Sequence, residues 1–421
     1  MPFDLDSLRR VVVLTLENRS FDHVLGWLQL ENSKVDGILS PRAQSTGPMS
    51  KCDPLKDRVH SFDLDPPHEA PYVAVQISDS TAKSYRHAFE DHHKDLPLEQ
   101  VHSEDICRYY TASELPITYF LAREYAVCDR WFCSVPTSTM PNRLYSMCGD
   151  SAGHIKTPIK DPTVPLTSIF DLMGDDWAVY SGGLSMSMTL GGVEKKRKYL
   201  KHQRALEEFQ MDCQSDVLPA LSWIEPRYDW MPHPNDDHPP TAVEAGQQLI
   251  KYVYEALHFH SKDWFRSVLI ITYDEHGGFY DHVSPEKIPE DARTRTDVAA
   301  GFTTYGPRVP AIIVSPFVDP GTVYSNIAEH SSILKFICKW KKLDSTKLSP
   351  RVTSVKTDDL MGVFNRSAAR LDFKQAPPAP EVPARFVETK GVGPSPTHQQ
   401  SKAISDWMKK KGLGKGPKTG Q

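Results

Sequence analysis

The chain has 421 residues, enough for one large α/β domain or two smaller ones. Its formal net charge of −5 argues against a general nucleic-acid binder, because such proteins carry a basic surface. Hydrophobic residues make up 39% of the sequence, which supports a sizeable core, and no stretch approaches the length of a membrane span.

The N-terminal residues and the cysteines indicate in which cellular compartment the protein is expected. The first 20 residues lack the basic region, long apolar core and cleavage site of a secretory signal. None of the seven cysteines forms a CxxC pair, so we expect reduced thiols and no zinc cluster. These features predict a cytoplasmic protein, with peripheral contact to a membrane surface left open.

The first predicted strand, Val11 to Leu16, is a continuous apolar run typical of a strand buried on both faces. It leads directly into Glu17 and Asn18, whose side chains offer hard oxygen ligands to a divalent cation. Asn18 or Ser20 can instead cap the helix that follows. Capping of the helix requires only one such residue, so it does not explain the presence of Glu17 next to Asn18.

Residues from about 36 to 98 show little periodicity and are rich in Pro, Ser, Asp and His. We expect long loops around the mouth of a site, not a separate domain. His87, His92 and His93 lie in a predicted helix, SYRHAFEDHH, where surface histidines are the more common case.

Three hydroxyl residues, Thr137 to Thr139, precede Met140, Pro141 and Asn142. A proline in the first helical turn is favourable, which places the hydroxyls at a helix N-terminus. Such a terminus attracts an anion such as phosphate. A threonine there either caps the helix or acts as a nucleophile, and the spacing alone favours the cap.

The segment from 221 to 257 predicts a strand, a loop and a helix. The strand is Leu221 to Glu225, and the loop contains Asp236, Asp237 and His238. Thr241 and Glu244 match a capping box at the start of the helix. Because another strand follows this helix, the alternation predicts an α/β fold with a doubly wound parallel sheet.

That next strand, Val268 to Thr272, is the centre of the predicted chemistry. Acidic and imidazole residues crowd behind it, namely Asp274, Glu275, His276, Asp281 and His282. Such groups at a strand end are a recurrent metal or acid/base arrangement. The alternative is a polar loop with solvated charges.

Two further elements follow, a strand at Val309 to Ser315 and a helix at Ser331 to Trp340. His330, at the start of that helix, can face the site or have a structural role. Because the sequence becomes rich in Pro, Lys and Ser near its end, we predict a catalytic domain at 1–345 and a C-terminal extension, linker and basic tail at 346–421.

Four separated motifs now stand in order along the chain. They are ENRSFDH from Glu17, TMPNR from Thr139, DDHPP from Asp236 and YDEHGGFYDHV from Tyr273. Together with GPRVPAIIVSPFV from Gly306 and EHSSILKFI from Glu329, they resemble the phosphoesterase family that contains non-specific and phosphatidylcholine-preferring phospholipases C and certain bacterial acid phosphatases. The resemblance covers roughly residues 10 to 340.

The resemblance implies an alkaline-phosphatase-like α/β/α sandwich with a mostly parallel sheet, and phosphoryl transfer through a hydroxyl beside a metal ion. By motif position, the implied metal residues are Glu17, Asn18, Asp274 and Glu275. Thr139 matches the nucleophile, Asn142 a phosphate-binding residue and His238 an active-site histidine. We add His276 and His330 as substrate-binding candidates.

The sequence departs from the family pattern before TMPNR. Many phospholipase members carry an Asp-Pro-Gly-His segment there. We take DSTAKSYRH, from Asp79 to His87, as the comparable region, so we expect the family histidine to be displaced or replaced.

The resulting hypothesis is a phospholipase C that cleaves glycerophospholipids to diacylglycerol and a phosphorylated head group by double displacement. Thr139 would be the nucleophile and His238 the acid that protonates the leaving alkoxide. The divalent metal would be Ca²⁺, Mg²⁺ or Mn²⁺. The alternatives are an acid phosphatase on the same fold and a non-catalytic phosphate- or lipid-binding protein. No nucleic-acid partner is expected.

Overall fold

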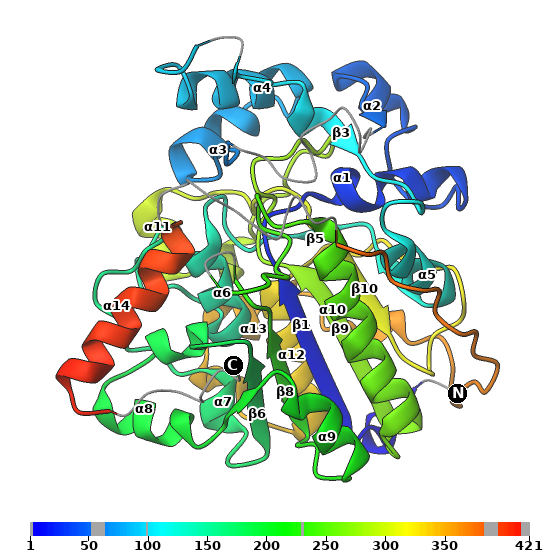
Figure 1. The fold of residues 1–421 in the computed structure, drawn as a ribbon, viewed down its shortest axis with the longest axis vertical. Helices are drawn as coiled ribbons and strands as arrows, with labels where there is room; N and C mark the ends of the chain where they lie inside the picture. Colours follow the sequence, from blue (N-terminus) through cyan, green and yellow to red (C-terminus); the bar gives the residue numbers. More distant parts are fainter. Residues whose placement is uncertain (1–2, 52–63, 98–99, 229–230, 383–394, 414–421) are drawn as a thin grey trace.

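The centre of the fold is an eight-stranded sheet in the order β11-β4-β10-β9-β1-β8-β6-β7 (Figure 1). The computed structural model describes residues 3–51, 64–97, 100–228, 231–382 and 395–413. The strands are β1 Arg10–Leu16, β4 Ala126–Cys128, β6 Trp177–Ser181, β7 Gln203–Ala205, β8 Leu221–Glu225, β9 Ser267–Tyr273, β10 Ala311–Val314 and β11 Thr322–Tyr324.

Strand direction in the sheet is almost uniform. β1, β6, β7, β8 and β9 pair in parallel, and β11 pairs in parallel with β4. Among these eight strands, β10 alone runs against its neighbours, β9 and β4. The mostly parallel α/β sheet predicted from the alternating pattern is therefore confirmed.

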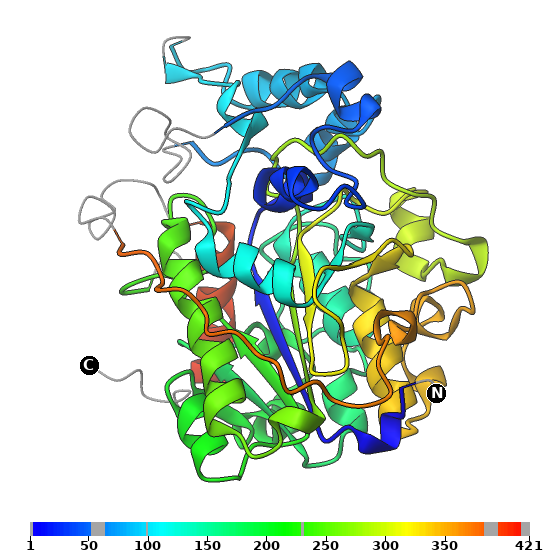
Figure 2. The ribbon, with the colours of Figure 1, turned by 90° about the vertical axis from the view of Figure 1, so that its right-hand side faces the viewer.

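Helices cover both faces of the sheet, which is why the central strands read as unbroken apolar runs (Figure 2). α5 (Pro116–Glu124) and α10 (Val243–Glu255) pack together on one face. α6 (Thr139–Cys148) and α12 (His330–Lys341) pack together on the other. The predicted α/β/α sandwich is the architecture observed.

The described residues between 21 and 109, which are 21–51, 64–97 and 100–109, form a cap above the carboxyl end of β1 (Figure 1). The cap contains α1 Phe21–Leu25, α2 Pro41–Thr46, β2 Ser50–Lys51, α3 Ala70–Gln76, α4 Ala82–His92 and β3 Arg108–Tyr109. The position of this segment agrees with the expectation of loops around the mouth of a site.

The remaining elements are mostly short. They are β5 Trp131–Phe132, α7 Ile169–Leu172, α8 Val193–Leu200, α9 Glu208–Gln214, α11 Arg295–Ala300, β12 Ala328–Glu329, α13 Pro350–Thr353 and α14 Pro396–Lys410.

The start of α10 differs from the prediction. The helix begins at Val243 with Ala242 at the N-cap position and no side-chain cap bond, so Thr241 and Glu244 form no capping box. Thr241 instead belongs to the preceding turn, where its N–H donates to the carbonyl of His238 at 2.6 Å. The loop that carries His238 therefore includes Thr241, which was predicted to cap the helix, and continues to Ala242.

Residues beyond the predicted domain boundary at 345 pack against the catalytic part. The Arg351 guanidinium on α13 pairs with Asp297 at 2.8 Å, and both side chains are buried. On α14, Ile404 and Met408 are buried, and Gln400 accepts a bond from the backbone N–H of Ile159. The division into domain and extension stays a prediction, and the tail beyond residue 413 lies outside the described residues.

The described cysteines are all free and buried, namely Cys107, Cys128, Cys133, Cys148, Cys213 and Cys338. Cys52 lies outside the described residues. No helix in the described ranges combines the length and apolar character needed to cross a membrane.

Candidate active site

The register of β1 against β9 brings two of the predicted metal residues together. Leu16 pairs with Tyr273, the last residue of β9, so Glu17 and Asp274 leave the sheet side by side. The Asp274 N–H donates to the Leu16 carbonyl at 3.1 Å, and the Asn18 N–H donates to Asp274 Oδ1 at 3.2 Å. Motifs some 250 residues apart in sequence therefore form one unit at the carboxyl edge of the sheet.

The four predicted metal residues are all buried, namely Glu17, Asn18, Asp274 and Glu275. Neither side-chain polar atom of Asn18 has a hydrogen-bond partner among the described residues, and the same is true of Glu275 Oε1. Buried polar atoms are rarely left without a partner. A set of carboxylate and amide oxygens with such atoms fits a hard divalent cation, so the donor chemistry agrees with the predicted site.

Arg143 links these carboxylates to α6. Its guanidinium lies 3.2 Å from Glu17 Oε1 and 3.4 Å from Asp274 Oδ2. Burial raises the pKa of Asp274 to about 6, although the charge of Arg143 opposes that rise. Thr139 precedes Arg143 by four residues on the same helix, so the two side chains lie on the same face of α6. The start of α6 is therefore held next to Glu17 and Asp274.

Thr139 is the first residue of α6, and it does not cap the helix. Ser138 occupies the N-cap position without a side-chain cap bond. The Met140 N–H is instead satisfied by Thr157 Oγ1 at 2.8 Å, from a separate segment. Pro141 has no N–H, so among the first three helical residues Thr139 is the one that can present an N–H to an anion. The capping alternative for Thr139 is thus not what the structure shows.

The side chain of Asn142 holds the loop that precedes Thr139. Its Oδ1 accepts from the Val135 N–H at 3.1 Å. Its Nδ2 donates to the carbonyls of Thr137 at 2.8 Å and of Val135 and Ser138 at 3.2 Å each. These contacts position the loop that precedes Thr139. The role of Asn142 in binding the substrate phosphate stays a prediction.

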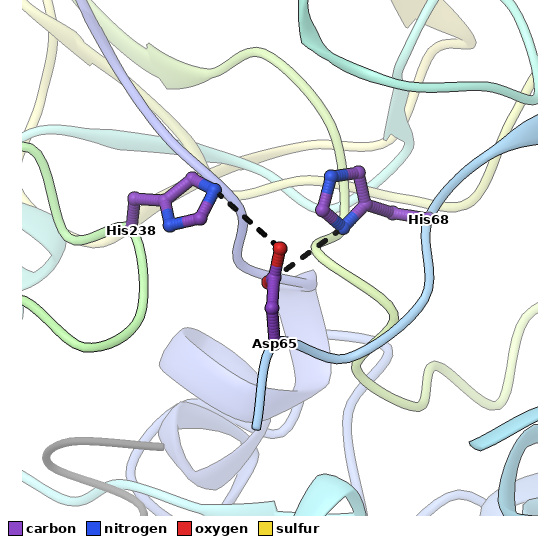
Figure 3. A group of neighbouring side chains, drawn as sticks. All are labelled: Asp65, His68 and His238. Carbon is purple, nitrogen blue, oxygen red and sulfur yellow. Dashed lines mark ion pairs between the residues drawn. The ribbon is translucent and has the colours of Figure 1, made fainter. Parts of the chain in front are cut away.

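His238 follows β8, on the other side of β1, in a loop joined to the predicted metal residues. The Glu17 N–H donates to the Asp236 carbonyl at 2.8 Å. His238 Nδ1 donates to the Pro239 carbonyl at 2.5 Å, which fixes the ring. The other ring nitrogen, Nε2, lies 4.0 Å from Asp65 Oδ2 (Figure 3). Nε2 is therefore the ring nitrogen that faces the Asp65 carboxylate.

Asp65 and His68 complete this part of the site, and the sequence analysis missed both. Their ligand atoms and that of His238 lie within 4.8 Å of one another (Figure 3). His68 is buried, whereas His87 is exposed on α4. The expectation that residues 79–87 replace the family Asp-Pro-Gly-His segment is wrong. The comparable segment is Asp65-Pro66-Pro67-His68, and a search that allowed one mismatch would have found it.

The cap holds His68 close to the predicted metal residues. A Cβ on Gly278 would lie 2.7 Å from the Pro67 carbonyl oxygen, so the bare glycine lets the two loops touch. Burial acts to lower the pKa of His68, but the negative charges of Glu275, Asp65 and Glu69 raise it to about 10. His68 thus brings positive charge close to the acidic edge of the sheet.

His276 and His330, the two further substrate-binding candidates, are engaged within the protein. His276 Nε2 donates to Gln76 Oε1 at 2.8 Å, which ties α3 to the loop after β9. His330 Nε2 donates to the Asp274 carbonyl at 2.7 Å, and its Nδ1 accepts from Trp131 Nε1 at 3.4 Å. Burial lowers the pKa of His330 to about 4. A neutral His330, with both ring nitrogens hydrogen-bonded, therefore holds the backbone of Asp274 in place.

The sequence of the chain was compared with models of known protein families. The model of the family described as "Phosphoesterase family" matches residues 8–343. The chain belongs to the phosphoesterase family. It is therefore a phosphoric ester hydrolase, and the resemblance drawn from the motifs is confirmed.

Individual relatives of this phosphoesterase are similar over most of its length. Non-specific phospholipase C1 of Arabidopsis thaliana is 33% identical over 82% of this chain and 69% of that protein. The hemolytic phospholipase C of Pseudomonas aeruginosa is 27% identical over 90% of this chain and 58% of its own length. A solved alkaline phosphatase superfamily protein from Vibrio parahaemolyticus aligns with 9% identity and a TM-score of 0.33 over 59% of this chain and 64% of that one.

In a second acidic cluster of the phosphoesterase, an arginine side chain supplies the positive charge. The ligand atoms of Asp22, Asp281 and His282 lie within 4.8 Å of one another. The Arg308 guanidinium lies 3.0 Å from Asp22 and 2.9 Å from Asp281, and all these side chains are buried. The arginine balances the two carboxylates, so this cluster is an ion network that joins the cap to the sheet.

His282 is the titrating member of that network. Its Nδ1 lies 2.6 Å from Asp22 Oδ2 and its Nε2 lies 3.0 Å from Asp36 Oδ1. Burial acts to lower the pKa of His282, but Asp22 and Asp36 raise it from an ordinary 6.5 to about 9. A protonated histidine therefore stabilises the fold. This contribution is complete below about pH 6.5 and is lost as the pH rises through about 9.

The first prediction concerns this pH dependence. In His282→Gln, the free energy of unfolding should fall most at about pH 6, and the difference from the native protein should shrink towards about pH 10. Urea denaturation at several pH values measures it, with His87→Gln on the exposed side of α4 as the control. A loss that is the same at every pH would contradict the assignment of a charged His282.

Proposed function

We propose that this phosphoesterase is a phospholipase C that releases diacylglycerol and a phosphorylated head group from glycerophospholipids, with Thr139 as nucleophile. One observation carries the proposal. Thr139 starts α6 free of a capping role, one helical turn before Arg143, which contacts both Glu17 and Asp274. The relatives named as phospholipases C support the choice of a phosphodiester lipid as substrate.

The metal residues would be Glu17, Asn18, Asp274 and Glu275. When bound, a divalent cation such as Ca²⁺, Mg²⁺ or Mn²⁺ supplies positive charge that lowers the pKa of a nearby hydroxyl and neutralises phosphate oxygens. The choice among these three ions stays open, since all prefer oxygen ligands.

The first half-reaction transfers the phosphorylated head group to Thr139. The Thr139 hydroxyl gives its proton to solvent, and its oxygen bonds to phosphorus in line with the diacylglycerol oxygen, whose bond to phosphorus breaks. His238 Nε2 gives its proton to that departing oxygen, because an alkoxide is a poor leaving group without one. The Thr139 N–H and the positive charge of His68 stabilise the phosphate oxygens.

The second half-reaction regenerates the enzyme. His238 Nε2, now without its proton, takes one from a water molecule as the water oxygen bonds to phosphorus. The Thr139 oxygen departs and takes a proton from solvent, and the phosphorylated head group is released. Asn142, His276 and His330 take part by holding the Thr139 loop, the loop after β9 and Asp274 in place, in agreement with their hydrogen bonds.

A lipid substrate also requires contact with a lipid surface, so peripheral membrane contact is part of this proposal. The cytoplasmic location expected from the sequence stays a prediction.

Product analysis tests the substrate class. The native protein should release diacylglycerol and a phosphorylated head group from mixed micelles of phosphatidylcholine and phosphatidylethanolamine. A chelator should abolish the release, and added Mg²⁺, Mn²⁺ or Ca²⁺ should restore it. Hydrolysis of p-nitrophenyl phosphate alone would replace the proposal with an acid phosphatase on the same fold.

Replacement of the nucleophile tests the role of Thr139. Thr139→Ala should lower kcat by at least about a thousandfold, as for other enzymes that lose a nucleophile, while substrate binding is retained. Thr137→Ala is a matched control in the same loop, since the Thr137 hydroxyl donates to the Ile155 carbonyl at 2.7 Å. We expect its kcat to stay within about threefold of native. Unchanged turnover in Thr139→Ala would overturn the assignment.

A further inference from the structure

Asp237, next to the proposed acid His238, has an unusual environment. It is buried, and its backbone is left-handed, with φ of 70°. Aspartate tolerates this conformation better than most residues, but it is uncommon outside glycine. A residue kept in such a conformation must be held by its surroundings.

Two hydrogen bonds hold Asp237, and both come from neighbours of metal residues. Tyr273, just before Asp274, donates its hydroxyl to Asp237 Oδ2 at 2.6 Å. Arg19, just after Asn18, donates from Nε to the Asp237 carbonyl at 2.9 Å. With the bond from the Glu17 N–H to the Asp236 carbonyl, the loop before His238 is fixed at three points to the ends of β1 and β9.

Gly246 in the first turns of α10 leaves room for this carboxylate. A Cβ at Gly246 would lie 1.9 Å from Asp237 Oδ1, closer than any real contact. Glycine inside a helix costs roughly 1 kcal/mol relative to alanine, so its presence needs a reason. Because Asp237 is packed between Tyr273 and the helix, its side chain cannot move aside.

We propose that Asp237 is a positioning residue, whose bond to Tyr273 sets His238 at the correct place relative to the metal residues. The inference rests on the proposed function, in which His238 is the acid. It adds that the acid and the metal residues are aligned by one side-chain contact between the loops after β8 and β9.

The leaving group separates this role from a merely structural one. A diacylglycerol alkoxide must receive a proton as it departs, whereas a nitrophenolate departs without one. A displaced His238 therefore slows the release of diacylglycerol from phosphatidylcholine in the first turnover, and leaves the first-turnover release of nitrophenolate from p-nitrophenyl phosphorylcholine almost unchanged. General damage to the site slows both reactions equally.

The experiment measures the rate of leaving-group release in the first turnover for these two substrates. For Tyr273→Phe, this rate on phosphatidylcholine should fall at least about tenfold, with the substrate concentration at half-maximal rate unchanged and with p-nitrophenyl phosphorylcholine affected by less than about threefold. Gly246→Ala should show the same selectivity. Asp237→Asn keeps an oxygen that accepts from Tyr273, so it should retain activity that Asp237→Ala loses.

Tyr180→Phe is the matched control. The Tyr180 hydroxyl donates to Asp212 Oδ2 at 2.7 Å on β6, so this variant removes a Tyr–Asp bond elsewhere in the fold. Both substrates should be turned over at near-native rates. Equal losses on the two substrates in Tyr273→Phe, or no loss on either, would overturn the inference.

His238→Gln distinguishes failure of the inference from failure of the proposed function. A leaving-group dependence in His238→Gln without one in Tyr273→Phe would overturn the role of Asp237 alone. No such dependence in His238→Gln would remove the acid role of His238 from the proposed function, and the inference with it.

Discussion

The parallel pairing of β1 with β9 is the constraint on which the site depends. Strand pairing fixes Leu16 opposite Tyr273, and every site residue that follows either strand takes its place from that match. A shift of one residue would turn Glu17 and Asp274 to opposite faces of the sheet. Because both strands are buried on both sides, such a shift would also break the core. Fold stability and site geometry are therefore determined by the same contacts.

Buried charge is the second constraint, since uncompensated carboxylates in a protein interior are strongly destabilising. The chain solves this in two ways. Around Asp22 and Asp281, the guanidinium of Arg308 and the ring of His282 supply the positive charge. Around Glu17 and Asp274, Arg143 supplies part of it. Asn18 and Glu275 keep polar atoms without partners among the described residues, which distinguishes the chemical site from the structural network.

The sequence predicted the strands more accurately than it predicted the loops and the contacts of single side chains. The ends of β1, β8 and β9 were predicted to within one residue, because a strand buried on both faces has a continuous apolar run in its sequence. The grouping of Glu17 with Asp274 was implied by the family resemblance, and the pairing of β1 with β9 places the two residues at one edge of the sheet. Contacts across loops left no periodic signal. Asp65 and His68 were missed because their segment differs at one position from the family Asp-Pro-Gly-His pattern. The contacts that occupy Asn142 and His330 depend on side-chain directions that the sequence does not encode locally.

A covalent adduct on Thr139 would test the central claim most directly. The protein would be mixed with phosphatidylcholine micelles and quenched in acid within a turnover, and the peptide that contains Thr139 would be analysed by mass spectrometry. The account predicts a phosphorylcholine group on Thr139 in the native protein, and none on that peptide in Thr139→Ala. Diacylglycerol release with no adduct, or with an adduct on another residue, would contradict the account.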